Sequence, residues 1–141
     1  MISSKAAGID NVSLDIARES LVLLKNEDNI LPLGDRYKKI AVVGYEASDR
    51  YVQLGDYTPP IDESSCMTVS EGMRIYAPSG VSAQYVRGCG FSEEMPKEKE
   101  KAIKAAKAAD IVVVVIGGSS SRFGGAEFDG NGAAIANEKK R

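Results

Sequence analysis

Histidine is absent from this sequence of 141 residues, and only two cysteines occur in it. Without histidine the chain lacks the commonest general base, the commonest metal ligand and any Ser-His-Asp triad. The spacing of Cys66 and Cys89 matches no metal or redox motif, so both are expected to be free thiols. Cys89 is expected to be a small buried residue at the end of a strand. The sequence therefore predicts no metal site and no cofactor.

Strong charge of one sign and long apolar runs are missing as well. The net charge is −2, with basic and acidic side chains mixed, which gives no basic face for phosphate backbones. The longest apolar run, Ile111 to Ile116, has six residues, whereas about 20 are needed to cross a bilayer. The N-terminus lacks the charged-then-apolar order of a signal peptide. Neither nucleic acid nor a membrane is predicted as a partner, and the compartment is left open, with the cytoplasm favoured.

The composition, 43% hydrophobic and 27% charged, is typical of one globular domain. Residues 1–12 are interpreted as a linker. Ser13 is a good N-cap residue, and apolar residues recur after it at helical spacing, which predicts a helix from Leu14 to Lys25. Ile30 to Leu33 is expected to be extended, because a residue before proline avoids the helical region.

The remainder of the chain alternates between strand and helix patterns. The predicted strands are Lys39–Gly44, Val81–Cys89 and Ile111–Ile116, the predicted helices are Val69–Tyr76 and Pro96–Ala109, and the stretch Tyr45–Cys66 is expected to be irregular. The fold class is therefore α/β, with an open, mostly parallel, flavodoxin-like sheet and helices on both faces. The almost unbroken β-branched run of the third strand predicts that it is central and parallel.

Ligands of such sheets bind beyond the carboxyl ends of the strands. Those ends lead into the loop from Gly44 to Tyr57, into Cys89 and Gly90, and into the loop from Gly117 to Gly132. The last loop holds six glycines, three consecutive serines and Arg122. It is either a site for a polar ligand or a flexible surface loop.

Nucleotide motifs fail at these strand ends. Gly44 is not followed by the G-x-G-x-x-G fingerprint, and the Gly117 loop lacks the lysine of a phosphate-binding loop. Three carboxylates, Asp56, Glu127 and Asp129, could serve acid chemistry there. For each of them alone, a solvated loop acid is the favoured interpretation.

Several ordered motifs resemble those of a known enzyme family. They are ARESLVLLKNEDNILPL at Ala17–Leu33, KKIAVVG at Lys38–Gly44, QLGDYTPP at Gln53–Pro60, YVRGCGF at Tyr85–Phe91, AIKAAKAADIVVVVIGGSSSR at Ala102–Arg122 and GAAIANEK at Gly132–Lys139. In this order they are similar to the segment leading into, and the front part of, the C-terminal α/β domain of family 3 glycoside hydrolases, the β-glucosidase and β-xylosidase family.

The resemblance implies a divided active site. Residues 13–141 would form the first portion of the α/β sandwich, and residues 1–12 would be the linker from a preceding barrel domain of the same polypeptide. The barrel would carry the Asp nucleophile, and a G-E-G-x-D-R motif beyond Arg141 would carry the acid/base. The parent would be a retaining, exo-acting enzyme for β-linked glucosides or xylosides, and the chain alone is expected to be inactive, since both carboxylates are needed.

The resemblance also places sugar contacts on the strand-end loops. The expected substrate-binding residues are Asp56, Tyr57, Ser119, Ser120 and Arg122, and Glu127 is a candidate for substrate contact or acid/base catalysis. Two other functions stay open from the residues alone. One is a non-catalytic carbohydrate-binding or scaffold module, and the other is a flavodoxin-like nucleotide-binding domain, which the failed phosphate motifs disfavour.

Overall fold

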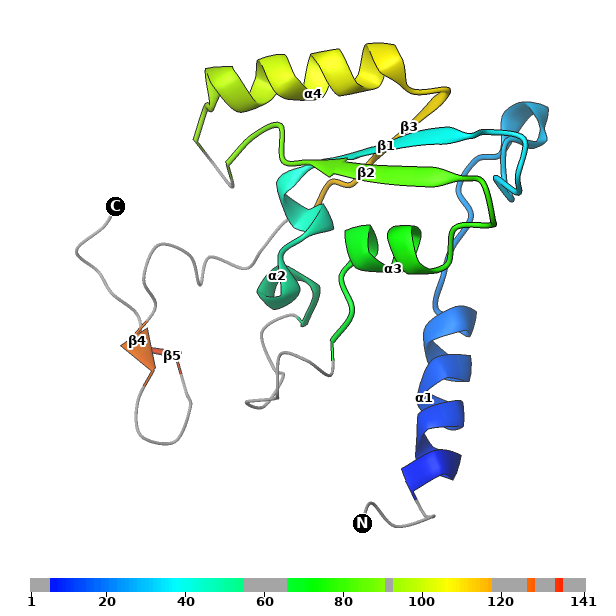
Figure 1. Ribbon diagram of the computed structural model, residues 1–141. Coiled ribbons are helices and arrows are strands. Elements are labelled where there is room, and N and C mark those ends of the chain that lie inside the picture. Colours follow the sequence, from blue (N-terminus) through cyan, green and yellow to red (C-terminus); the bar gives the residue numbers. More distant parts are fainter. Residues whose placement is uncertain (1–5, 55–65, 91–92, 118–126, 129–133, 136–141) are drawn as a thin grey trace. The chain divides into compact units, whose positions relative to one another are not determined.

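A computed structural model describes residues 6–54, 66–90, 93–117, 127–128 and 134–135. The chain divides into two compact units, Met1–Leu33 and Gly34–Arg141, and the elements of both are labelled in Figure 1. No helix in the described ranges is long and apolar enough to span a membrane.

The first unit contains helix α1, Ala6–Glu19. The predicted helix from Leu14 to Lys25 is therefore wrong at both ends, and most of the predicted linker 1–12 is helical. Ser13 lies inside the helix rather than at its N-cap. The helix ends where the Ser20 hydroxyl donates to the Ala17 carbonyl at 2.7 Å and occupies an acceptor that a further helical turn would need.

Beyond α1 the first unit is held by local contacts. The Asn26 side chain accepts from the Leu31 backbone N–H and donates to the Leu31 carbonyl, both at 2.9 Å. This pair closes a short 3₁₀ turn, Glu27–Asn29. The four residues Leu21 to Leu24, which were expected to be helical, lie outside any helix and are 63–91% exposed.

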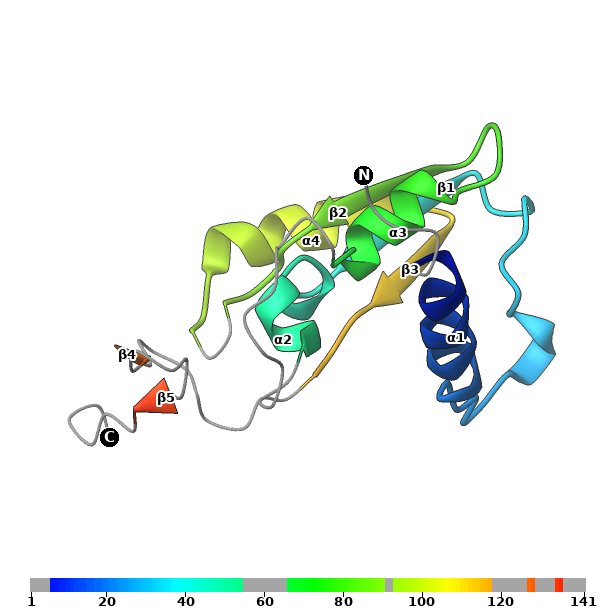
Figure 2. The ribbon, with the colours of Figure 1, turned by 90° about the horizontal axis from the view of Figure 1, so that it is seen from below.

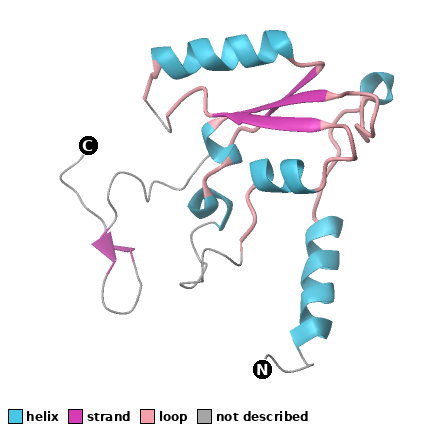
Figure 3. Cartoon of the chain, in the orientation of Figure 1, coloured by secondary structure: helices cyan, strands magenta, loops and turns pink. Residues whose placement is uncertain are grey.

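The second unit is built on a parallel sheet of β1 (Lys39–Val43), β2 (Ser82–Val86) and β3 (Ile111–Val114), in the order β2-β1-β3. The predicted parallel α/β sheet is confirmed (Figure 3). The central strand is β1, however, and within the described residues β3 is an edge strand. An unbroken apolar run shows that a strand is apolar, but it does not encode the order of strands in the sheet.

Helices cover both faces of this sheet, as predicted. Helix α4 (Pro96–Ala108) packs on β1 and β2, while α3 (Val69–Ile75) packs against β2 on the opposite face (Figures 1 and 2). The core consequently lies on β1, where Ile40, Ala41 and Val42 are each no more than 4% exposed. This burial explains why β1 is apolar at consecutive positions rather than at alternate ones.

Asp110 fixes the amino-terminal edge of the sheet. Its carboxylate accepts the backbone N–H groups of Lys38 and Lys39 at 2.7 and 2.8 Å. These two hydrogen bonds, the Lys39 bond first, hold the pKa of Asp110 below its ordinary value. One side chain that precedes β3 thus fixes the start of β1.

Two shorter strands complete the described residues. Strands β4 (Glu127–Phe128) and β5 (Ala134–Ile135) pair antiparallel, with Glu127 opposite Ile135.

Candidate functional site

The carboxyl end of β1 turns sharply at Gly44. This residue has φ 129° and ψ 146°, a conformation that is essentially limited to glycine. A Cβ atom at this position would overlap the carbonyl oxygen of Val115, which follows β3. The close approach keeps the ends of β1 and β3 together, and the Val115 N–H donates to the Val43 carbonyl at 2.8 Å.

The chain after Gly44 is helical rather than irregular, so the predicted irregular stretch Tyr45–Cys66 is wrong at its start. A 3₁₀ turn spans Tyr45–Ala47, and helix α2 spans Arg50–Leu54. Asp49 is the residue before α2, and its Oδ1 accepts the Val52 N–H at 3.0 Å. Asp49 therefore caps the first turn of α2.

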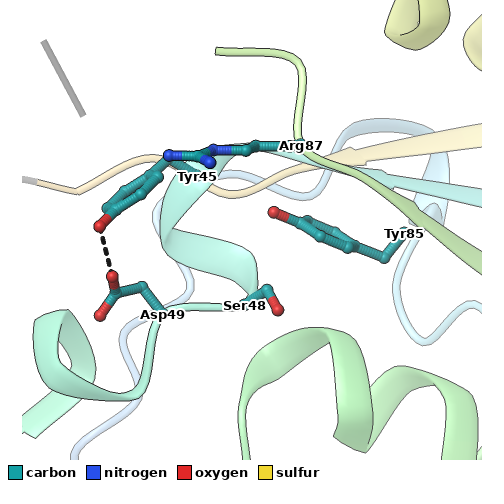
Figure 4. Close-up of a pocket in the computed structure, with 5 residues that line it drawn as sticks. All are labelled: Tyr45, Ser48, Asp49, Tyr85 and Arg87. Carbon is teal, nitrogen blue, oxygen red and sulfur yellow. Dashed lines mark hydrogen bonds between the residues drawn. The ribbon is translucent and has the colours of Figure 1, made fainter. Parts of the chain in front are cut away.

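A pocket of about 420 Å³ lies at the ends of β1 and β2. It is lined by Tyr45, Ser48 and Asp49 from the segment after β1, and by Tyr85 and Arg87 from β2 and the residue after it. Figure 4 shows these five side chains around the pocket. Strand register explains the meeting, because Val43 and Val86 are paired in the sheet, so the residues that follow them emerge side by side.

The Tyr45 ring has partners at both its hydroxyl and its face. Its hydroxyl donates to Oδ2 of Asp49 (Figure 4). The hydrogen bond to Asp49, then burial and the negative charge of the same carboxylate, raise the pKa of Tyr45 to about 12. The Arg87 guanidinium lies 4.9 Å from the ring centroid, a cation–π distance, and its charge partly opposes the rise in the pKa of Tyr45.

Arg87 is held on a second side, because its Nε donates to the Cys89 carbonyl at 3.2 Å. Cys89 itself is exposed, so its predicted burial at a strand end is wrong. Strand β2 ends at Val86, three residues before the predicted end, and the chain is already leaving the sheet at Arg87. Both cysteines are free, as expected.

Two hydroxyl groups of the pocket have no partner within the part of the chain that the structure describes. They belong to Tyr85 and Ser48, and no hydrogen bond links either of these hydroxyls to another described residue. Burial raises the pKa of the Tyr85 phenol, so this side chain stays neutral and its O–H remains available as a donor. The pocket therefore combines fixed charged groups with unpaired hydroxyls.

A second cluster links α2 to α3. Arg50 donates through Nε to the Cys66 carbonyl at 3.0 Å and forms an ion pair with Glu71. Glu71 and the buried Thr68 make a capping box at the start of α3, with the Thr68 N–H donating to Glu71 at 2.8 Å and the Glu71 N–H to the Thr68 hydroxyl at 3.2 Å. Arg50 thereby joins the start of α2 to Cys66 and to the first turn of α3.

The structure locates the expected site residues only in part. Six of the predicted polar residues lie outside the described residues, namely Asp56, Tyr57, Ser119, Ser120, Arg122 and Asp129. The backbone of Glu127 lies in β4. The segments that follow β1 and β3, from which the two predicted loops were expected to start, do contact each other. Glu46, after β1, lies next to Gly117, after β3.

The sequence reasoning missed all five residues that line the pocket. It pointed to the correct edge of the sheet, since ligands bind beyond the carboxyl ends of parallel strands. However, it extended β2 to Cys89, which counted Arg87 as a strand residue, and it overlooked the N-cap signal of Asp49 before a helical segment. Within the described residues, no group of three potential metal ligands occurs, and the pocket offers hydrogen bonds and aromatic faces instead.

Several known proteins are similar to this chain in sequence. A β-xylosidase of Formosa agariphila is 32% identical over 121 residues, which cover 79% of this chain and 16% of that protein. A periplasmic β-glucosidase of Salmonella typhimurium is 30% identical over 125 residues, covering 74% of this chain and 16% of the relative. The chain thus spans about a sixth of the length of these relatives.

Solved structures show the same fold. A β-glucosidase involved in saponin metabolism from intestinal bacteria superposes with a TM-score of 0.67 at 24% identity, covering 86% of this chain and 20% of the other. A GH3 exo-β-xylosidase in complex with a xylobiose aziridine activity-based probe gives 0.64 at 25% identity, covering 92% and 15%. The profile of the glycosyl hydrolase family 3 C-terminal domain matches residues 21–141. The chain therefore belongs to glycosyl hydrolase family 3, within the C-terminal domain of that family.

Proposed function

We propose that this chain is part of a retaining, exo-acting β-glycosidase that hydrolyses β-glucosides or β-xylosides. Family membership supports the proposal, as do the printed names of the similar proteins, which are β-xylosidases and β-glucosidases. The observation that carries it is the meeting of the β1 and β3 ends at Gly44 and Val115. The chain segments that lead toward the expected sugar contacts leave the sheet at this one edge.

The proposed chemistry divides the catalytic carboxylates between parts of a longer polypeptide. A retaining glycosidase needs one carboxylate as nucleophile and a second, about 5–5.5 Å away, as acid and then base. The nucleophile is proposed to come from a barrel domain of the same protein. Glu127 is the candidate of this chain for substrate contact or acid/base work. Alone, the 141-residue chain should therefore not hydrolyse aryl β-glucosides or β-xylosides.

The other expected residues are proposed to hold the sugar. Asp56 and Arg122 would make charge-assisted hydrogen bonds to its hydroxyls, Ser119 and Ser120 would add neutral ones, and Tyr57 would offer a ring face.

The test replaces Asp56 or Arg122 by alanine in the longer polypeptide and measures kcat/KM with aryl β-xyloside and β-glucoside. Each charge-assisted bond is worth about 1.5–3 kcal/mol, so kcat/KM should fall roughly 10- to 150-fold. Asp35→Ala and Lys104→Ala are matched controls, because both residues are exposed, and they should change the rate less than about threefold. Wild-type kinetics in both test variants, or a loss of activity that follows a loss of folded protein, would count against substrate contact.

A further inference from the structure

We propose that the pocket at the ends of β1 and β2 binds a neutral sugar ring through Tyr85, Ser48, Arg87 and Asp49. The inference rests on the proposed function only for the class of ligand, a sugar. The pocket itself is defined by the geometry of described residues (Figure 4). Its volume of about 420 Å³ lies within the range of small-molecule sites, about 300–1,000 Å³.

The unpaired hydroxyls give the first argument. Tyr85 and Ser48 both line the pocket, and no hydrogen bond joins their hydroxyls to other described residues. A hydroxyl both donates and accepts, and a sugar ring presents hydroxyls that do the same. The Nη groups of Arg87, which have no hydrogen-bond partner in the described ranges, add donors, and the Asp49 carboxylate adds acceptors.

Charge decides which class of sugar fits. The charge of Arg87 lowers the pKa of both pocket tyrosines, whereas Asp49 raises the pKa of both, Glu93 that of Tyr45 and Glu46 that of Tyr85. The surroundings are therefore negative on balance, which disfavours a phosphate or a uronic acid. A neutral pyranose avoids this repulsion and can still bond to both charged groups.

Preorganisation gives the third argument. Asp49 is fixed by the Val52 N–H and by the Tyr45 hydroxyl, while Arg87 is fixed by the Cys89 carbonyl and the Tyr45 ring. Groups that are already ordered lose little conformational freedom when a ligand binds. The tyrosine rings supply apolar faces beside these polar groups, and a sugar ring has a matching apolar face of C–H groups.

The test titrates the ¹⁵N-labelled 141-residue chain with methyl β-xyloside and with methyl β-glucoside, each to about 100 mM sugar, and follows the amide signals by NMR. We expect a dissociation constant in the millimolar range. Amide signals of residues 45–49 and 85–88 should shift and saturate with at least one of these sugars. Sodium glucuronate should bind at least about tenfold more weakly, because of the carboxylates around the pocket.

Variants separate the pocket from a general effect on folding. Tyr85→Phe removes one hydroxyl and keeps the ring, so it should weaken binding about 3- to 10-fold, and Ser48→Ala should weaken it similarly. Tyr76→Phe makes the same chemical change at a side chain that is 77% exposed outside the pocket and should leave binding unchanged. Unshifted pocket amides with both sugars, equal affinity for glucuronate, or wild-type affinity in both Tyr85→Phe and Ser48→Ala would overturn the proposal.

The two proposals can fail separately. If the pocket binds no sugar while the longer polypeptide hydrolyses aryl β-glycosides, only the pocket proposal is wrong. If the pocket binds a neutral sugar and the longer polypeptide has no glycosidase activity, only the proposed function is wrong.

Discussion

Replacing Gly44 by alanine should destabilise the second unit strongly, unlike the same replacement at Gly72. The added Cβ would overlap the Val115 carbonyl oxygen and lie 3.1 Å from its carbonyl carbon, both backbone atoms that cannot rotate away. A non-glycine residue at φ 129° and ψ 146° also costs about 1–3 kcal/mol. Moving Val115 would weaken its 2.8 Å hydrogen bond to Val43, at about 0.5–1.5 kcal/mol.

The sum, about 1.5–4.5 kcal/mol, is a large part of the 5–15 kcal/mol that stabilises a typical domain. The melting temperature, followed by circular dichroism at 222 nm, should fall by at least about 6 °C. Gly72→Ala is the matched control. Gly72 lies inside α3, and its added Cβ would make an ordinary contact with the Met67 sulfur at 3.7 Å. Alanine in place of glycine stabilises a helix interior by about 0.5–1 kcal/mol. Equal melting temperatures for Gly44→Ala and the wild type would refute the proposed close approach of β1 and β3.

Two further predictions concern single side chains. The folded-state pKa of Tyr45 is about 12, against an ordinary 10.0, so the Tyr45–Asp49 hydrogen bond stabilises the fold fully below pH 10 and its contribution is lost as the pH rises from 10 to 12. The difference in 295 nm absorbance between the wild type and Tyr45→Phe should therefore titrate near pH 12. A midpoint near pH 10 would contradict the hydrogen bond. Thr68→Ala removes the buried N-cap of α3 and should lower the free energy of unfolding, measured in urea, by about 0.5–2 kcal/mol. Thr68→Ser keeps the hydroxyl and should lower it less. Equal losses in both variants would show that the hydroxyl does not stabilise the helix.

The parts of the fold that could be predicted are those with a strong local pattern. The run at β1 predicted a strand covered on both faces, and Ile40, Ala41 and Val42 are buried. Pro96 predicted the start of α4, which begins at that residue, because proline suits the first helical turn. Each pattern depends only on residues that are neighbours in the sequence, so the prediction drawn from it holds without knowledge of the rest of the fold.

The errors concern competition between local signals and information that is not local. Ser13 suits an N-cap by residue type, but helix α1 already begins at Ala6 and runs through it. The position of β3 at an edge depends on which strands pair, and four consecutive apolar residues look alike at an edge and at the centre.

The pocket could not be predicted because it depends on register. Tyr45 and Arg87 are far apart in sequence, and only the pairing of Val43 with Val86 brings them together. A shift of one residue would point every side chain of β2 to the opposite face. The rule that ligands bind beyond strand ends found the correct edge of the sheet, but the identity of the side chains at that edge had to come from the structure.

The most direct test of a retaining β-glycosidase is the anomeric form of its first product. The longer polypeptide that includes this chain is mixed with an aryl β-xyloside or β-glucoside, and the anomeric protons of the released sugar are followed by ¹H NMR in the first minutes. We expect the β-anomer to appear first and the α-anomer to follow by mutarotation, because two displacements restore the starting configuration. The 141-residue chain alone should release no sugar. Release of the α-anomer first would contradict the proposed function. So would hydrolysis by the 141-residue chain alone, if this activity elutes together with the chain when the chain is purified again.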